Sequence, residues 1–195
     1  MKKIELTLFF SSLILILLDF LNLLHPKYDF ILILILFSLS LFYLFLGFAI
    51  FNNLQFRRIF AKSSYSHISN KRILGAIFTG IVYYMSITGI FSKFLLWPGA
   101  IILPLLGVIG ILIITIIAFF KMNNSDIFYS KILIRNNILG LICVCLLFIP
   151  LDTWLNLRYS DYPDFINAVH ESEANPNNKT LQHKKWDEME KMYEL

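Results

Sequence analysis

Charged side chains in or beside long apolar segments are the residues of this sequence that could do chemistry. Asp19 lies near one end of the first apolar segment, and Lys93 and Asp152 lie at the matching ends of two others. His25 and Lys27 follow in an adjoining connection. A charge within a membrane span is costly and by default indicates a functional site. Asp19, Lys93 and Asp152 could thus form an outer polar cluster at which a proton or an ion enters.

The same residues allow a purely structural explanation. Asp19 and Lys93 could form an ion pair that fixes the first apolar helix to the third. A conducting route needs further ionisable groups, or waters held by polar groups, across the middle of the membrane. The apolar segments hold no acidic or basic residue that would continue such a path. We therefore expect the structural pair, and we keep the ion-entry site as the alternative.

We find no motif for catalysis or metal binding in this sequence. Cys143 and Cys145 are two residues apart, so on one helix they point about 200° apart and cannot share a metal ion. The acids and histidines also lack a recognisable spacing for a membrane-embedded lipid-modifying enzyme. We expect no catalytic residue, no metal and no cofactor, and we rank an enzyme lowest.

The composition predicts the elements that must position these residues. Hydrophobic residues make up 57% of the chain and charged residues 15%, and the mean hydropathy is +0.69. A helix of about 20 apolar residues crosses the hydrocarbon core of a bilayer. We therefore predict an all-α, polytopic membrane protein with a bundle of about five transmembrane helices in residues 1–157 and a short, acidic helical tail in residues 158–195. The predicted spans are residues 6–24, 30–51, 73–92, 99–120 and 137–155.

A short break between the third and fourth spans predicts a tight hairpin. Pro98 cannot continue a helix but suits the first turn of a new one. Trp97 is typical of the headgroup level of a membrane, and Lys93 can extend its ammonium group toward water. We therefore assign the turn to Trp97, Pro98 and Gly99.

This hairpin resembles the transmembrane hairpin of the GldL family, membrane proteins of the gliding-motility and type IX secretion motor. The resemblance covers some thirty residues and rests on the pattern Gly89-Ile90-Phe91-x-Lys93-x-x-x-Trp97-Pro98-Gly99-Ala100, followed by Gly107. In that family a His usually precedes the Trp-Pro-Gly turn, and the next helix carries a Glu used in proton-driven rotation. Here Leu96 replaces the His, and residues 99–120 hold no acid. The resemblance therefore implies the hairpin and not the motor activity.

Basic residues in the short connections predict the orientation. Ten lie on the side of the N-terminus, and two, Lys27 and Lys93, lie on the other. An excess of Lys and Arg marks the cytoplasmic side, so we expect a cytoplasmic N-terminus and a periplasmic C-terminus. Residues 52–72 carry five of the ten and no acid, and their position between spans favours lipid headgroups over nucleic acid as their partner. The ten are Lys2, Lys3, Arg57, Arg58, Lys62, Lys71, Arg72, Lys121, Lys131 and Arg135.

The tail has its own pattern, with eight acids and five bases from residue 158 onward. Its last helix is predicted to start near Thr180 and to turn Lys184, Lys185, Asp187 and Glu188 to water. The apolar side of that helix is a candidate docking surface for a protein partner. The docking residues are Leu181, Trp186, Met189 and Tyr193.

These observations lead to one main functional hypothesis. We expect a small multi-pass protein of the bacterial inner membrane that is a structural or interaction subunit of a cell-envelope assembly. Its expected partners are the lipid bilayer and a membrane or periplasmic protein. The alternative is an ion-conducting or motor-related subunit akin to the GldL family.

Overall fold

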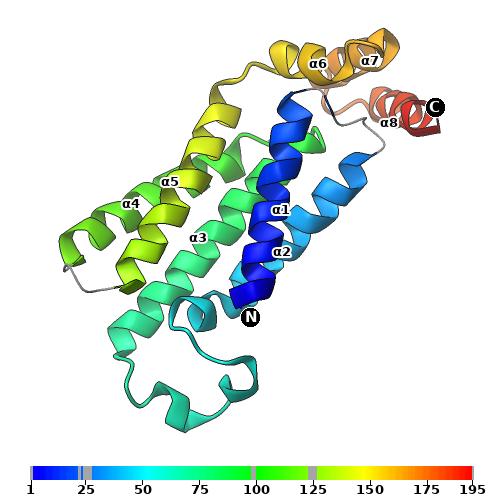
Figure 1. Ribbon diagram of the computed structural model, residues 1–195. Helices are drawn as coiled ribbons and strands as arrows, with labels where there is room; N and C mark the ends of the chain where they lie inside the picture. Colours follow the sequence, from blue (N-terminus) through cyan, green and yellow to red (C-terminus); the bar gives the residue numbers. More distant parts are fainter. Residues whose placement is uncertain (1, 22, 24–27, 98–99, 123–126, 195) are drawn as a thin grey trace. The chain divides into compact units, whose positions relative to one another are not determined.

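The computed structural model describes residues 2–21, 23, 28–97, 100–122 and 127–194. Within them the chain forms α-helices and no strands (Figure 1), so the all-α prediction is confirmed. The α-helices are α1 (Lys2–Phe20), α2 (Asp29–Phe51), α3 (Asn70–Phe94), α4 (Ile102–Lys121), α5 (Ile127–Phe148), α6 (Leu151–Tyr159), α7 (Pro163–Ala174) and α8 (Lys179–Glu194). Two short 3-10 helices, Phe56–Arg58 and Lys62–Tyr65, lie between α2 and α3.

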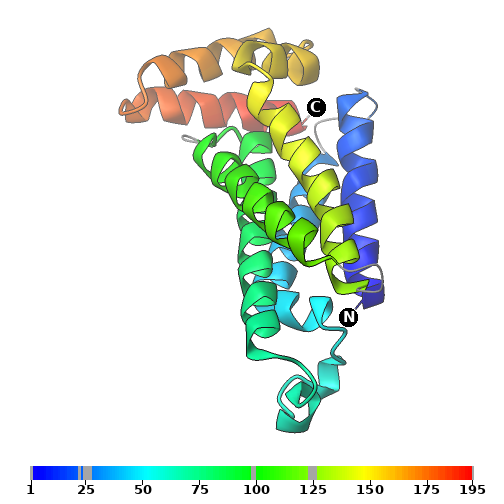
Figure 2. The same ribbon diagram turned by 90° about the vertical axis from the view of Figure 1, so that its left-hand side faces the viewer.

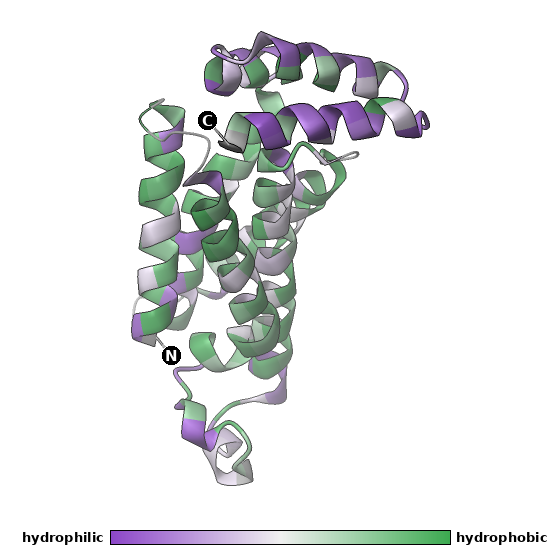
Figure 3. Cartoon of the chain, turned by 90° about the vertical axis from the view of Figure 1, so that its right-hand side faces the viewer, coloured by the Kyte–Doolittle hydropathy of each residue, from purple (hydrophilic) through white to green (hydrophobic). Residues whose placement is uncertain are grey.

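The helices belong to two compact units. The first unit comprises Met1–Ser11 and Leu34–Phe148, and the second comprises Ser12–Ile33 and Ile149–Leu195. Each unit therefore contains one end of α1 and one end of α2. The long helices of the first unit are mainly hydrophobic, whereas α7 and α8 of the second carry many hydrophilic residues (Figure 3).

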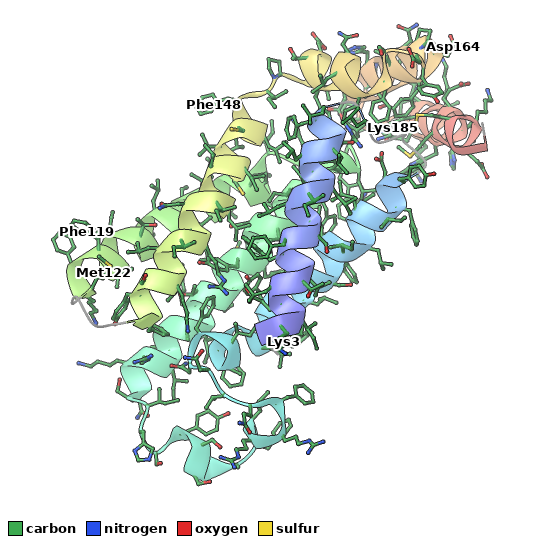
Figure 4. All side chains as sticks on the ribbon, viewed as in Figure 1. Lys3, Phe119, Met122, Phe148, Asp164 and Lys185 are labelled. Atoms are coloured by element: carbon green, nitrogen blue, oxygen red, sulfur yellow. The ribbon has the colours of Figure 1, made fainter. Side chains whose placement is uncertain are left out.

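Four helices are long and apolar enough to cross a membrane, namely α2, α3, α4 and most of α5. Their outward side chains are large and apolar, as at Phe119 near the end of α4, which points away from the bundle (Figure 4). Unpaired polar groups are not tolerated against lipid, and these faces expose hydrocarbon instead. The predicted membrane protein is supported to this extent, while the first of the five predicted spans, residues 6–24, stays a prediction. The corresponding helix, α1, has the charged residues Lys2, Lys3, Glu5 and Asp19.

The predicted fifth span, residues 137–155, differs from the structure at both ends. α5 begins ten residues earlier, at Ile127, and ends at Phe148, and α6 is a separate helix that begins at Leu151. Pro150 separates them because proline lacks the N–H that a continuing helix needs. Arg135 thus lies inside a helix and not in a polar connection.

Helices α3, α4 and α5 pack against one another in the first unit (Figure 2). Small residues bring the backbones close. A Cβ atom added at Gly89 would lie 2.5 Å from the backbone nitrogen of Pro104, and one added at Gly107 would lie 2.8 Å from the Cα atom of Ser86. Close contact of this kind is typical of membrane helices with small interface residues. Gly75 is different, since an added Cβ atom there would meet nothing within 4 Å.

This packing predicts opposite results at two glycines of α3. Gly89→Ala should lower the free energy of unfolding by about 1–3 kcal/mol, because the added methyl group collides with the backbone of α4. Gly75→Ala is the matched control and should not destabilise the protein, because it adds the same methyl group in open space. Thermal unfolding in detergent micelles measures both. Equal midpoints for the two variants would contradict the close approach of α3 and α4.

The second unit is built around a small aromatic core. Phe20 lies edge to face with Trp154 at 5.8 Å between ring centroids, and Tyr159 does so with Phe165 at 4.9 Å. α7 packs against both α6 and α8. Asn178 begins α8, since its side-chain oxygen accepts hydrogen bonds from the backbone N–H groups of residues 180 and 181 at 3.0 and 3.5 Å. The last helix therefore begins at Lys179, next to the start predicted near Thr180.

Candidate functional site

A buried cluster of two carboxylates and one guanidinium lies in the second unit. Asp19 comes from the last turn of α1, Asp29 from the first residue of α2, and Arg158 from the last turn of α6. Arg158 Nη2 lies 3.0 Å from Asp19 Oδ1 and 2.8 Å from Asp29 Oδ2, and Arg158 Nε donates to Asp19 Oδ1 at 3.1 Å. All three side chains are buried. One arginine thus ties three helices together.

Aromatic side chains complete the surroundings of Arg158. Its guanidinium carbon lies 5.0 Å from the ring centroid of Trp154, and its Nη1 donates to Tyr159 Oη at 3.0 Å. Tyr159 Oη in turn donates to Asp29 Oδ2 at 3.5 Å. Guanidinium groups favour such planar contacts together with charge-assisted hydrogen bonds. The pKa of Arg158 is raised: burial alone would lower it, but Tyr159, Asp29 and Asp19 favour the charged form.

Among the described residues, the cluster holds more negative than positive charge. Two carboxylates share one guanidinium, and one oxygen of each, Asp19 Oδ2 and Asp29 Oδ1, is buried without a hydrogen-bond partner among the described residues. Buried acceptors are normally satisfied, and an exception needs an explanation. An additional proton, or a cationic group from elsewhere, would balance this cluster.

A second buried ion pair lies in the first unit. Glu5 of α1 and Arg135 of α5 form a bidentate contact, with Nε to Oε1 and Nη2 to Oε2 both at 2.9 Å. Tyr43 of α2 donates to Glu5 Oε1 at 2.5 Å. Glu5 is 0% exposed, so its charge is fully removed from water. Such a pair is stable only with good geometry and additional hydrogen bonds, and both are present here.

A ring contact and a second group of hydrogen bonds lie next to this pair and involve the other helices of the first unit. Tyr83 of α3 lies edge to face with Tyr43 at 5.0 Å and donates to Asn136 Oδ1 at 2.6 Å. Asn136 of α5 then donates from Nδ2 to Thr115 Oγ1 of α4 at 2.8 Å. Polar contacts therefore join side chains of α1, α2 and α5 around Glu5, and side chains of α3, α4 and α5 around Asn136. The ring contact between Tyr43 and Tyr83 lies between these two groups. Fully satisfied networks of this kind make a fold rigid.

No family model, curated protein or solved structure matches this chain. The geometry therefore carries the functional argument.

Sequence reasoning found Asp19 but not its partner. The structure pairs Asp19 with Arg158, whereas the expected partner, Lys93, lies at the end of α3 in the first unit. The side chain of Asp152 is 76% exposed, and its Oδ1 lies 3.6 Å from Nε2 of His170. The predicted outer cluster is therefore not one compact group within either unit. Arg158 was missed because it was assigned to the polar tail, and Asp29 because it follows a polar turn.

The residues predicted for the hairpin turn and for the docking surface differ in how exposed they are, and some lie outside the described residues. Trp97 packs edge to face on Phe91 at 5.7 Å, while Pro98 and Gly99 lie outside the described residues. On α8, Trp186 is 45% exposed, but Met189 is buried. Leu181 is partly exposed, and the side chain of Tyr193 lies outside the described part.

Lys185 corrects the prediction that this residue faces water. Its side chain is buried, and its Nζ lies 5.4 Å from the ring centroid of Trp186. Burial lowers the pKa of Lys185, and the nearby Glu173 carboxylate partly opposes that change. The helical pattern placed Lys185 on the polar side of α8 because lysine is charged. It did not account for the long apolar stem, which a lysine side chain can bury.

Metal chemistry gains no support from the described residues. They contain no group of three His, Cys, Asp or Glu side chains that could hold a metal ion. Of the two cysteines, Cys143 is buried and Cys145 is exposed, in line with the opposite faces predicted from their spacing.

Proposed function

We propose that this chain is an integral membrane subunit with a structural or interaction role in a cell-envelope assembly. The observation that carries this proposal is the pairing of the charges inside the helical bundle. Arg135 is bidentate with Glu5, and Arg158 contacts both Asp19 and Asp29. Each contact joins helices that are far apart in the sequence. Charged groups in such pairs hold helices together. Breaking a pair so that one of its groups could bind a transported ion would cost several kcal/mol.

A span at α1 is part of the proposal. Its composition is more charged than that of the other long helices, but its charges at Glu5 and Asp19 are buried in ion pairs. The exposed large side chains of α1 are apolar, as at Phe10, Ile14 and Leu17. Helices whose polar groups face the bundle and whose apolar groups face outward suit a bilayer. We therefore place five helices across the bacterial inner membrane.

The basic residues support an orientation with a cytoplasmic N-terminus and a periplasmic C-terminus. Arg135 lies inside α5 and pairs with Glu5 of α1. We therefore no longer count it among the ten basic residues of the connections. Nine basic residues then remain on the N-terminal side against two on the other. This difference still favours the same orientation. The α7–α8 pair would then meet partners in the periplasm.

Trp186 is the residue through which we expect that partner to be contacted. Tryptophan is enriched at the energetic centres of protein interfaces, and this one is 45% exposed on a helix that is otherwise mostly polar. A photoreactive amino acid at position 186 should crosslink to a different envelope protein in intact membranes. The same probe at the exposed neighbour Asp187 is the matched control and should crosslink far less. Products confined to the chain itself, with no second protein in mass spectrometry, would contradict the interaction role.

One observation favours the second candidate function, an ion-linked subunit akin to the motor proteins that the hairpin resembles. The cluster around Arg158 has one carboxylate more than it has cations, and Asp19 Oδ2 and Asp29 Oδ1 accept no hydrogen bond within the described residues. A buried, unbalanced carboxylate can take up a proton. The charge excess alone gives a binding site and no route across the membrane, so we rank this function second.

A further inference from the structure

A cavity lies in the connection between α2 and α3, and none of its lining residues belongs to either buried cluster. Its volume is about 740 Å³, within the range of sites that hold small ligands. Its lining residues all belong to the first unit. They lie in the connection that follows α2, which can be traced in Figure 1. The lining residues are Asn53, Leu54, Gln55, Arg58, Ala61, Ser63, Ser64 and His67.

Hydrogen bonds hold the walls of this cavity. Tyr65 Oη donates to the carbonyl oxygen of Ile59, and Ser66 Oγ donates to that of Ser63 at 2.9 Å. Asn53 has a positive φ of 56°, and its side-chain oxygen accepts from Lys131 Nζ of α5 at 3.2 Å. The connection is therefore folded back on itself and attached to a neighbouring helix. Preformed sites of this kind bind without a large ordering cost.

The chemistry of the lining selects an anion. Residues 52–72 carry five bases and no acid, so a cation would find no counter-charge there. The side chains of Arg58 and His67 are exposed, and neither makes a hydrogen bond or ion pair within the described residues. Ser63 and Ser64 also line the cavity, and their hydroxyl groups are further possible donors. Guanidinium and hydroxyl donors around one cavity suit the oxygens of a phosphate group.

The position of the cavity selects the source of that phosphate. The connection joins two helices that are each apolar enough to span a membrane, so it emerges at the bilayer surface. Phe60 is 98% exposed and Phe56 is 64% exposed, on either side of the buried Ile59. Aromatic side chains at this level enter the headgroup region, and basic residues beside them attract anionic lipids.

We propose that this cavity binds the phosphate group of an anionic glycerophospholipid, with Arg58 as its main charged contact and Phe60 inserted beside the acyl chains. Arg58 and His67 donate to the phosphate oxygens, and Ser63 and Ser64 donate to the remaining acceptors. The proposal goes beyond the interaction role proposed above and does not depend on a protein partner. It requires only that α2 and α3 lie in a bilayer.

The test uses the full chain in neutral detergent micelles and phosphatidylglycerol as the probe, with bound lipid counted by native mass spectrometry. Arg58→Gln should weaken lipid binding by about tenfold or more, as expected for the loss of a charge-assisted hydrogen bond. Arg57→Gln is the matched control, because Arg57 is adjacent, equally charged and exposed, but does not line the cavity. It should weaken binding by about threefold or less, since it loses only surface attraction. Thermal unfolding of both variants confirms that they fold.

Two further arms separate the sources of the phosphate. Phe60→Ser should weaken the binding of phosphatidylglycerol and leave competition by inorganic phosphate unchanged. Phosphatidylcholine, which has a phosphate but no net charge, should bind weakly. Equal losses in the Arg57 and Arg58 variants would overturn the site and leave only surface attraction. Inorganic phosphate that binds as tightly as the lipid would overturn the lipid as the ligand.

Discussion

Arg158→Met is expected to unfold the second unit while the first unit stays folded. In the wild type both Asp19 and Asp29 contact Arg158 within 3.0 Å. The variant leaves these two carboxylates buried without their cation. Removing one partner of a buried ion pair costs about 3–5 kcal/mol, and here two pairs lose the same partner. That loss is large compared with the stability of a small folded unit. Methionine keeps most of the apolar stem, so lost packing contributes little.

Limited proteolysis and thermal unfolding in detergent micelles measure this effect. Cleavage should appear within residues 149–195, while a fragment that contains α3, α4 and α5 remains protected. The control is the triple variant Arg158→Met, Asp19→Asn, Asp29→Asn, which removes all three charges and should recover much of the lost protection. A triple variant that unfolds as readily as Arg158→Met would contradict the electrostatic explanation and leave the packing on Trp154 as the cause.

The single variant Asp29→Asn separates the two candidate functions. In vesicles that contain the purified chain, the structural role predicts no proton flux for either wild type or Asp29→Asn. The ion-linked role predicts a flux in the wild type that Asp29→Asn abolishes at unchanged protein abundance. Such a flux would place the function at the unbalanced carboxylates.

Composition predicted the class of fold because long apolar segments have few alternatives to membrane helices. The apolar stretches in α2, α3 and α4 lie close to the predicted spans. Local signals also mark the helix starts of the tail, where Pro163 begins α7 and Asn178 caps α8. A proline or an Asx residue acts on the backbone of its own turn, so its effect can be read from neighbouring residues alone.

The partners of the buried charges could not be predicted in this way. Glu5 and Arg135 are 130 residues apart, and each was assigned to a polar end outside a span. Their pairing depends on how α1 and α5 pack against each other. The long helices are all hydrophobic and similar in composition, so the sequence does not indicate which of them pack together. One signal was available: Glu5 is the single acid in the first turn of α1, directly before the long apolar run.

Arg158 shows the same limit in a different form. The sequence indicates a change to polar composition after Pro150, and the arginine was read as part of that change. The structure places it on α6 with its guanidinium buried. A single arginine near a composition boundary can belong to either side, and only its distant partners, here Asp19 and Asp29, decide which.

The pair of Glu5 and Arg135 gives the second large expected effect. Arg135→Met should lower the free energy of unfolding of the first unit by about 3–5 kcal/mol, because it leaves a fully buried carboxylate without its cation. Glu5→Gln should cost less, because the amide still accepts one hydrogen bond from Arg135. Tyr43→Phe should cost about 1–3 kcal/mol through the lost donor to Glu5 Oε1. Lys131→Met is the matched control: this lysine lies one turn before Arg135 and donates to the exposed Asn53.

A double-mutant cycle measured by thermal unfolding in micelles decides whether the pair acts as a unit. The combined variant Glu5→Gln, Arg135→Met should be more stable than the sum of the two single losses predicts, because the second change removes a charge that the first has already left unpaired. Lys131→Met should change stability by less than about 1 kcal/mol, as expected for an exposed contact. Strictly additive losses for Glu5 and Arg135 would mean that the two residues stabilise the first unit separately. The bidentate contact would then be a consequence of how α1 and α5 pack, and the apolar contacts between the helices would be what holds α1 in place.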